Sequence, residues 1–349
     1  MRLMHDRRRL LVSAGQAAAC VAICIVALSA AIAAAREPTA NAPAIDDVPA
    51  AIDRASSRAR AVEFDGNNTT LPPGGHLQGI QMVRTQRGGP QLVLLSHDST
   101  TVGYLLIVEL PDDPTTTGRV VSRLTFPSDG RLPPLRHAGG IQVADNVLVV
   151  GLEDNQQKTR SEVQFWNVAD PANPKRYPHL TIHRAGKPKD QTAGGVGIVG
   201  RDHDYLVAVA NWDSRAIDFY LSNGQPLASE ACRFELASRW QVEGADTRDW
   251  RPDKEFAPYQ AINLVADALD NIYLIGTGMA GGKNVVDLFA VDLDQPTPGQ
   301  LRKVLRKVMT LPTGNRLQYG GGVSWDGNRP VILSSPRNVS RRTRIGLAR

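Results

Sequence analysis

The chain has 349 residues, of which 42% are hydrophobic and 21% are charged. These proportions are typical of a globular protein and exclude a collagen-like or wholly disordered chain. The formal net charge is +5, but arginines in the first nine residues supply most of the excess, and no basic stripe with interleaved aromatic residues follows. We therefore expect no nucleic-acid partner.

Residues 1–35 have the pattern of an export signal. A basic segment up to Arg9 precedes an apolar run from Leu10 to Ala35 that ends in small residues. The stretch 6–11 is similar to a twin-arginine signal, which predicts export to the periplasm or the cell exterior. The apolar run of 26 residues is also long enough to cross a bilayer, so an inner-membrane anchor with the domain outside the cytoplasm is the alternative.

Residues 36–59 are rich in alanine and proline and show no apolar periodicity, which predicts a linker without packed elements. The remainder, 60–349, is expected to form one domain. It holds a single cysteine, Cys232, so no intramolecular disulfide can form there, and a buried side chain is the expectation.

One stretch, His137-Ala138-Gly139-Gly140-Ile141-Gln142, recurs along the chain and opens each group of short apolar runs. Its variants occupy 76–81, 192–197, 259–263 and 319–324, at intervals of about 60 residues. Each following run has four to eight residues and is bounded by Gly, Pro, Asn or Asp, which is typical of strands joined by turns. Five such units predict an all-β, five-bladed β-propeller with four antiparallel strands in each blade.

The expected strands follow in chain order, after a short N-terminal strand at 60–64. They are 79–83, 91–96, 104–110 and 119–126; 140–143, 147–152, 162–168 and 176–183; 196–199, 205–210, 216–221 and 233–236; 262–265, 271–276, 286–293 and 301–309; and 322–325, 330–334 and 343–348. The stretch 301–309 has helical spacing of its apolar residues, but its place in the repeat favours a strand. The last unit is one strand short, so we expect 60–64 to pair with the C-terminal blade and to close the ring.

Propeller geometry would bring two sets of residues to one mouth of the channel. The starts of the inner strands supply His76, His137, Thr192, Tyr259 and Tyr319, and the turns between second and third strands supply His97, Asp98, Glu153, Asp154, Trp212, Asp213, Arg215 and Arg337. Imidazoles and carboxylates suit acid–base catalysis or a divalent metal. The alternative is structural, because histidines beside glycines and aspartates in turns often bond only to neighbouring backbone.

These residues divide into candidate roles. The catalytic candidates are His76, His97, His137 and Asp98; the candidate ligands for a divalent metal are His76, His137, Glu153 and Asp154; and the ligand-binding candidates are Thr192, Trp212, Asp213, Arg215, Tyr259, Tyr319 and Arg337. The insertion 238–258, with Trp240 and Trp250 among charges, is expected either to cover the mouth as a lid or to serve packing only.

The repeated His-x-Gly-Gly-Ile-Gln opening resembles that of exported bacterial propellers of an uncharacterised family. The resemblance covers 76–349 at the level of architecture and implies no activity. Five-bladed glycosidases share the expected blade count, but only 5% of residues are aromatic, a poor supply of the surface on which sugars stack. The sequence thus predicts a monomeric propeller that binds a small molecule or protein at the mouth. The alternatives are a metal-dependent or acid–base hydrolase at the same mouth, and a protein-interaction scaffold.

Overall fold

The computed structural model describes residues 45–349 except 85–88, 112, 114–115, 129 and 132, and except the side chain of Arg84. The predicted export signal and the first part of the predicted linker lie outside the described residues. The chain forms two units, Met1–Ala42 and Pro43–Arg349, and only the second is described. None of the helices in the described residues has the length and apolar character needed to span a membrane.

The described chain is almost entirely β-structure, which confirms the predicted all-β class. Three sheets are open and antiparallel: β6 (His137–Ala144), β7 (Val147–Glu153), β8 (Arg160–Asn167), β9 (Lys175–Arg176) and β10 (Ile182–Ala185); β11 (Gly195–Gly200), β12 (Tyr205–Ala210), β13 (Ala216–Ser222) and β14 (Phe234–Gln241); and β15 (Ala261–Ala266), β16 (Ile272–Ala280), β17 (Lys283–Val291) and β18 (Leu301–Met309). Short 3₁₀ turns occupy Pro178–Leu180 (η1), Trp212–Ser214 (η2), Val242–Gly244 (η3) and Thr297–Gly299 (η4).

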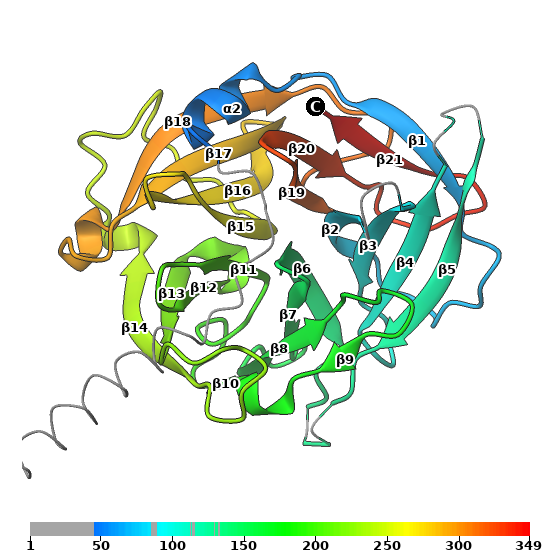
Figure 1. The fold of residues 1–349 in the computed structure, drawn as a ribbon, viewed down its shortest axis with the longest axis horizontal. Coiled ribbons are helices and arrows are strands. Elements are labelled where there is room, and N and C mark those ends of the chain that lie inside the picture. Colours follow the sequence, from blue (N-terminus) through cyan, green and yellow to red (C-terminus); the bar gives the residue numbers. More distant parts are fainter. Residues whose placement is uncertain (1–44, 85–88, 112, 114–115, 129, 132) are drawn as a thin grey trace, which may run out of the picture. The chain divides into compact units, whose positions relative to one another are not determined.

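The remaining strands form one closed, mixed sheet of eight. Its order is β1 (Arg60–Asp65), β21 (Thr343–Ala348), β20 (Arg329–Ser334), β19 (Gly321–Asp326), β2 (Leu77–Arg84), β3 (Gln91–His97), β4 (Tyr104–Leu110) and β5 (Gly118–Thr125). The N-terminal strand pairs antiparallel with the last strand, Phe64 opposite Thr343, as the missing strand of the last unit predicted. The sheets surround a common centre in a propeller-like arrangement (Figure 1).

The prediction of five separate four-stranded antiparallel blades is wrong. The strands of the first and last units join through two parallel contacts, Gly321 with Gly79 and Phe64 with Gly118. Glycine favours this approach, since a Cβ at Gly118 would lie 3.3 Å from the Cβ of Phe64. The sheet that begins with β6 departs from the four-strand pattern in another way, because the turn η1 splits its outer strand into β9 and β10.

The inner strands β2, β6, β11, β15 and β19 surround the centre (Figure 1). A Cβ at Gly140 would lie 2.9 Å from the Cα of Ala261, so these backbones touch directly. The side chain of Gln142 joins three strands, since its Oε1 accepts from the amides of Ile198 at 2.9 Å and Leu264 at 2.8 Å. The glycine and glutamine of the repeated stretch therefore hold the centre together.

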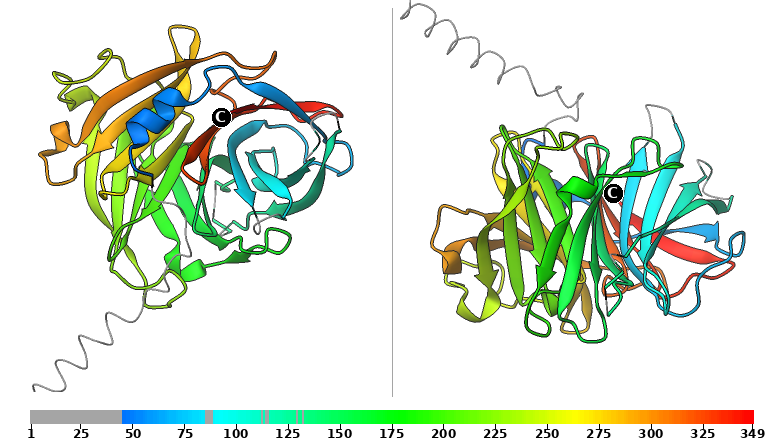
Figure 2. Two further views of the ribbon diagram at one scale, coloured as in Figure 1. Left: turned by 45° about the horizontal axis from the view of Figure 1, so that its top comes forward. Right: turned by 90° about the horizontal axis from the view of Figure 1, so that it is seen from below.

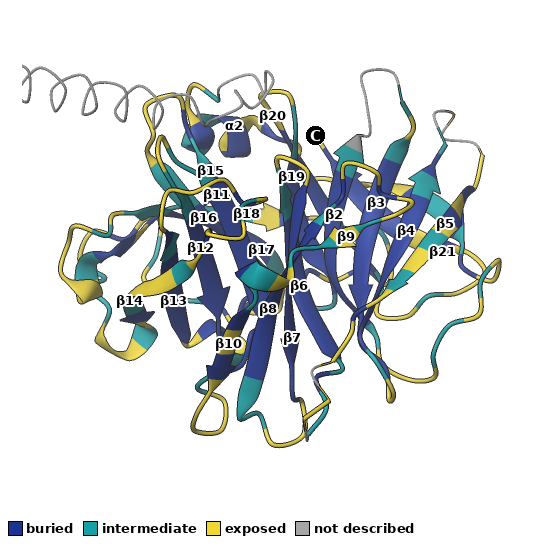
Figure 3. Cartoon of the chain, turned by 60° about the horizontal axis from the view of Figure 1, so that its bottom comes forward, coloured by how far each residue is buried: buried dark blue, intermediate teal, exposed yellow. Residues whose placement is uncertain are grey.

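Most strands near the centre are buried on both faces (Figure 3). All seven residues of β7 are buried, because the sheet lies between two neighbouring sheets. The outer strand β18 differs: its burial alternates at Leu301, Arg302 and Lys303. It is a strand, as its repeat position predicted, and its helical spacing reflects the polar residues that an outer strand carries.

The helix α2 (Val48–Arg54) contradicts the prediction that residues 36–59 hold no packed element. Asp47 caps it, because its side chain accepts from the amide of Ala50 at 2.8 Å. Val48 and Ile52 are fully buried in a cluster that includes Met309 and Ile332. Figure 2 shows α2 beside β18. With only seven residues, the helix is too short for apolar periodicity to reveal it in the sequence.

Truncation of Ile52 tests whether α2 is part of the domain. The Ile52→Ala variant is expected to lose about 2–5 kcal/mol of unfolding free energy in urea titration, because it leaves a cavity in a fully buried site. Asp53→Ala is the matched control on the exposed face and should change stability by less than about 0.5 kcal/mol. Equal stability of the two variants would mean that α2 is detached in solution.

Candidate functional site

A pocket of about 120 Å³ lies where loops of several sheets meet, and we call it the mouth pocket. It is lined by His76, Gln78, His137, Glu153, Asn155, Gly194, Asn211, Trp212, Asp213, Tyr259 and Gln260. The lining residues come from the starts of inner strands and from the turns between second and third strands. It thus brings together many of the predicted candidates: His76, His137, Glu153, Trp212, Asp213 and Tyr259.

His137 and Glu153 form a buried pair in this pocket. His137 begins β6 and Glu153 ends β7, and the register places them directly opposite each other. The Nδ1 atom of His137 lies 3.0 Å from Oε1 of Glu153, whose side chain is 1% exposed. The other carboxylate oxygen accepts from the amide of Ala193 at 2.7 Å. Glu153 is therefore held in place to orient the imidazole of His137.

The environment raises the pKa of His137. Burial alone would lower the pKa, because it disfavours the charged imidazolium, but the close contact with the Glu153 carboxylate and its negative charge outweigh burial. Asp98 adds a smaller effect in the same direction, and Lys158 opposes it. The pair therefore favours a histidine that holds its proton to a higher pH than an ordinary histidine does.

Gln78 connects the two histidines of the pocket. Its Nε2 atom lies 2.8 Å from Nε2 of His137 and 3.0 Å from Nδ1 of His76. A neutral His137 would accept a hydrogen bond from this amide, whereas a protonated one would need the amide oxygen instead. Sequence reasoning missed Gln78, whose only signal was its position two residues after His76 on the same side of the strand.

The turn η2 presents Trp212 and Asp213 to the pocket. Asp213 and Ser214 both have left-handed backbone conformations, with φ of 56° and 55°. The ammonium of Lys158 lies 3.5 Å from the ring centroid of Trp212, a cation–π contact on the indole. Asp213 is exposed, and no other described residue pairs with its carboxylate. Its carboxylate is therefore available to a ligand.

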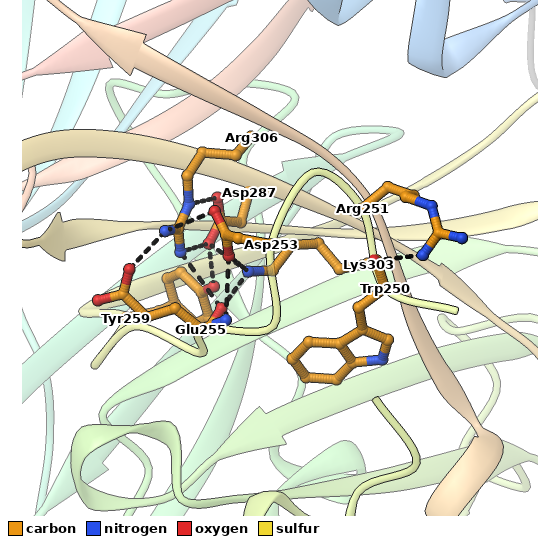
Figure 4. Close-up of polar contacts among 8 residues, drawn as sticks. All are labelled: Trp250, Arg251, Asp253, Glu255, Tyr259, Asp287, Lys303 and Arg306. Carbon is orange, nitrogen blue, oxygen red and sulfur yellow. Dashed lines mark hydrogen bonds and ion pairs between the residues drawn. The ribbon is translucent and has the colours of Figure 1, made fainter. Parts of the chain in front are cut away.

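Tyr259 contributes to the pocket wall, but its hydroxyl is used inside the protein. The side chain is 2% exposed, and the hydroxyl donates to Oδ2 of Asp287 at 2.5 Å. Burial, and then the charge of Asp287, raise the pKa of Tyr259 well above its ordinary value. Asp287 in turn binds Arg306 and belongs to an ionic cluster with Asp253, Glu255 and Lys303 (Figure 4). Asp287 and Lys303 are buried in this cluster, whereas the side chains of Asp253 and Glu255 are 40% and 52% exposed.

Four of the predicted candidates hold structure near the pocket without lining it. His97 stacks on Tyr104, with ring centroids 4.7 Å apart, and burial lowers its pKa. Asp98 accepts from the amide of His76 at 2.5 Å. Asp154 caps its own turn by accepting from the amides of the two glutamines that follow Asn155. Thr192 is fully buried. Asp98 and Asp154 thus accept hydrogen bonds from nearby backbone amides, which are the contacts that the structural alternative expects.

The remaining candidates lie outside the pocket lining. Arg215 is exposed and forms an ion pair with Glu243. Two guanidinium groups lie near the ring of Tyr319, that of Arg316 at 5.8 Å and that of Arg337 at 5.6 Å from the ring centroid. Within the described part of the chain, no group of three or more His, Cys, Asp or Glu side chains has the arrangement of a metal site.

The insertion 238–258 packs into the protein, which agrees with the packing alternative. Trp240 is fully buried and Trp250 is 1% exposed, and their rings stack with centroids 6.4 Å apart. The indole nitrogen of Trp250 donates to the carbonyl of Leu301 at 3.1 Å. Trp250 therefore attaches the insertion to β18, Trp240 lies within β14, and neither tryptophan lines the mouth pocket. Cys232 is buried, as expected, and burial raises the pKa of its thiol.

No protein-family model matches the chain, and no curated protein matches it significantly. Among solved structures, an exo-β-1,3-galactanase from Phanerochaete chrysosporium is 12% identical with a TM-score of 0.44, over 83% of this chain and 63% of that protein. A putative glycoside hydrolase from Parabacteroides distasonis is 11% identical with a TM-score of 0.43, over 79% and 87%. A thermostable family-43 glycoside hydrolase is 9% identical with a TM-score of 0.42, over 81% and 91%.

These neighbours are glycoside hydrolases, so the resemblance to an uncharacterised family gains no support from them. The chain spans less than two thirds of the length of the galactanase. With TM-scores below 0.5, the similarities are too weak to transfer an activity to this chain.

Proposed function

We propose that the protein is an acid–base hydrolase that acts on a small polyhydroxylated substrate in the mouth pocket. The buried His137–Glu153 pair carries this proposal, because an imidazole oriented by a carboxylate is the usual arrangement of a general base. The predicted export signal would place this activity in the periplasm or outside the cell, and this location is part of the proposal.

The pocket lining favours a neutral, hydrogen-bonding substrate. Amides of Gln78, Asn155, Asn211 and Gln260 supply paired donors and acceptors. The indole of Trp212, over which the Lys158 ammonium lies, supplies an aromatic surface. Neither Lys nor Arg is among the described lining residues, which disfavours a phosphorylated ligand. A sugar-like molecule matches this combination of flat polar groups and one aromatic ring.

The proposed reaction begins when Nε2 of His137 takes a proton from a water molecule. The water oxygen forms a bond to the electrophilic carbon of the substrate as the bond to the leaving oxygen breaks. The imidazolium then returns its proton to that leaving oxygen, so the residues end unchanged. Glu153 stabilises the imidazolium through Nδ1, and Gln78 gives up its contact with Nε2 as the water enters.

Binding without turnover is the second candidate, and Gln78 favours it. The Nε2 atom of His137 is already 2.8 Å from Nε2 of Gln78, so both ring nitrogens have partners inside the protein. In this case the two histidines and the amides would serve only to bind a ligand, and the carboxylate of Glu153 would only fix their orientation.

Chromogenic substrates separate the two candidates. The purified protein is assayed with 4-nitrophenyl glycosides, 4-nitrophenyl phosphate and 4-nitrophenyl acetate, and we expect nitrophenol release from a glycoside. His137→Ala should lower kcat/KM by about 100-fold, as expected for loss of a general base. His203→Ala, which removes an exposed histidine outside the mouth pocket, is the matched control and should leave kcat/KM unchanged.

Three outcomes would count against hydrolysis by this pair. If His137→Ala kept full activity, the assignment of His137 would be wrong. If EDTA abolished the activity, the acid–base assignment would be replaced by a metal-dependent one. If no substrate were hydrolysed but calorimetry detected binding of a free monosaccharide that His137→Ala weakened, the binding candidate would replace the hydrolase.

A further inference from the structure

The turn η2 has an unfavourable backbone conformation where it faces the mouth pocket. Asp213 and Ser214 are consecutive non-glycine residues with positive φ. Such residues are strained, and they persist only where surrounding contacts hold them. The turn supplies Asn211, Trp212 and Asp213 to the pocket lining. The contacts that hold the turn therefore determine the positions of the Trp212 indole and the Asp213 carboxylate.

One contact comes from the side of the preceding sheet. The hydroxyl of Thr192 accepts from the amide of Trp212 at 2.7 Å. The carbonyl of Thr192 accepts from the guanidinium of Arg184, which is itself fixed by Asp218, Nη2 to Oδ2 at 2.6 Å. The side chains of Arg184 and Asp218 are only 1% and 2% exposed. The position of Thr192 is thus set by a buried ion pair.

A second contact comes from the side of the following sheet. The hydroxyl of Ser214 donates to the carbonyl of Tyr259 at 2.8 Å. Tyr259 is fixed at its far end by Asp287, which Arg306 holds through two nitrogens (Figure 4). Each end of the turn is therefore held by one hydroxyl hydrogen bond, from Thr192 or Ser214. Behind each of these bonds lies an aspartate–arginine pair with a buried aspartate.

The geometry points to Thr192 as a positioning residue that holds η2 so that Trp212 and Asp213 face the substrate. This inference rests on the proposed function of the mouth pocket. It gives Thr192 a role in substrate binding that needs no direct contact between Thr192 and the ligand. Thr192 is fully buried and does not line the pocket, so its hydroxyl acts through Trp212. Ser214, which is 1% exposed, holds the other end of the turn in the same way.

Paired substitutions at Thr192 test the inference. Thr192→Val keeps the shape but removes the acceptor for the Trp212 amide, and Thr192→Ser keeps the acceptor. With the 4-nitrophenyl glycoside that the protein hydrolyses, we expect Thr192→Val to raise KM about tenfold with little change in kcat, since it misplaces a binding surface and spares His137. Thr192→Ser should keep the KM of the unmodified protein.

Thr343→Val is the matched control. Thr343 is also a buried threonine that holds a turn, through Ser340, but it is not a lining residue of the mouth pocket. It should lose stability to a similar degree without a change in KM. A KM in Thr192→Val that matches the control would overturn the inference.

Amide hydrogen exchange gives a readout that does not depend on activity. Thr192→Val should speed exchange in peptides covering 211–216 at least about tenfold, while peptides of β3 and β4 keep their protection. Unchanged exchange in 211–216 would overturn the positioning role even if a substrate is found. Faster exchange without any hydrolysis of the chromogenic substrates would leave the positioning of the turn standing and count against the proposed function alone.

Discussion

Replacement of Asp287 by alanine is expected to lower the free energy of unfolding by about 3–5 kcal/mol, because two buried cations would lose a shared counter-ion. Arg306 binds both oxygens of Asp287 at 2.7 Å, and the Lys303 ammonium lies 3.8 Å from Oδ2. Asp287 and Lys303 are fully buried and the Arg306 side chain is 9% exposed. The hydrogen bonds that Arg306 donates to Asp287 raise the pKa of the guanidinium in the unmodified protein. An arginine stays protonated without such a partner as well, so Arg306 remains charged in the variant.

Urea titration followed by tryptophan fluorescence measures the loss, and Glu109→Ala is its matched control. Glu109 and Arg119 are also opposite residues on the last two strands of a unit, but this pair is largely exposed. Exposed pairs contribute little, so Glu109→Ala should lose less than about 1 kcal/mol. Addition of Arg306→Met to Asp287→Ala should restore part of the lost stability. If Asp287→Ala were no less stable than the control, the cluster would be open to water.

The strands could be predicted from the sequence because a single local pattern repeats. Each inner strand contains a small residue before a β-branched or aliphatic one, and backbone contacts such as that of Gly140 with Ala261 demand this pattern. The joining of the first and last units could not be predicted in this way. It depends on pairing between glycines such as Gly79 and Gly321, which are far apart in the chain and differ in no visible way from the other repeated glycines.

The pocket was predictable in several charged and aromatic members, such as Glu153, Asp213 and Trp212. His137 and Glu153 stand at corresponding ends of neighbouring strands, and the repeat register alone brings them together. Gln78 was missed because a neutral amide in a repeated stretch carries no distinct signal. Thr192 and Tyr259 were expected to meet a ligand, but their hydroxyls bind Trp212 and Asp287 inside the protein. Which way a side chain turns depends on partners from other sheets, and local sequence does not contain that information.

Replacement of Glu153 by glutamine is expected to reverse the pH dependence of stability that His137 contributes. In the unmodified protein the pKa of His137 is raised above its ordinary value of 6.5. The resulting stabilisation is therefore fully present below pH 6.5 and is lost as the pH rises through the raised pKa. In Glu153→Gln the burial of the ring remains without the carboxylate, so the pKa of His137 should fall below 6.5 and stability should decrease as the pH falls.

The loss in Glu153→Gln should be about 3–5 kcal/mol at pH 5, where an imidazolium would be buried without its counter-ion, and much smaller at pH 8, where His137 is neutral. Urea titrations at both pH values and an NMR titration of the His137 ring measure the two effects. Glu230→Gln is the matched control, because Glu230 lies 3.5 Å from Nδ1 of His179 but is 87% exposed. The control should follow the unmodified protein at both pH values. If Glu153→Gln kept the original direction of the pH dependence, a group other than Glu153 would set the pKa of His137, and the oriented base of the proposed reaction would have to be sought elsewhere in the pocket.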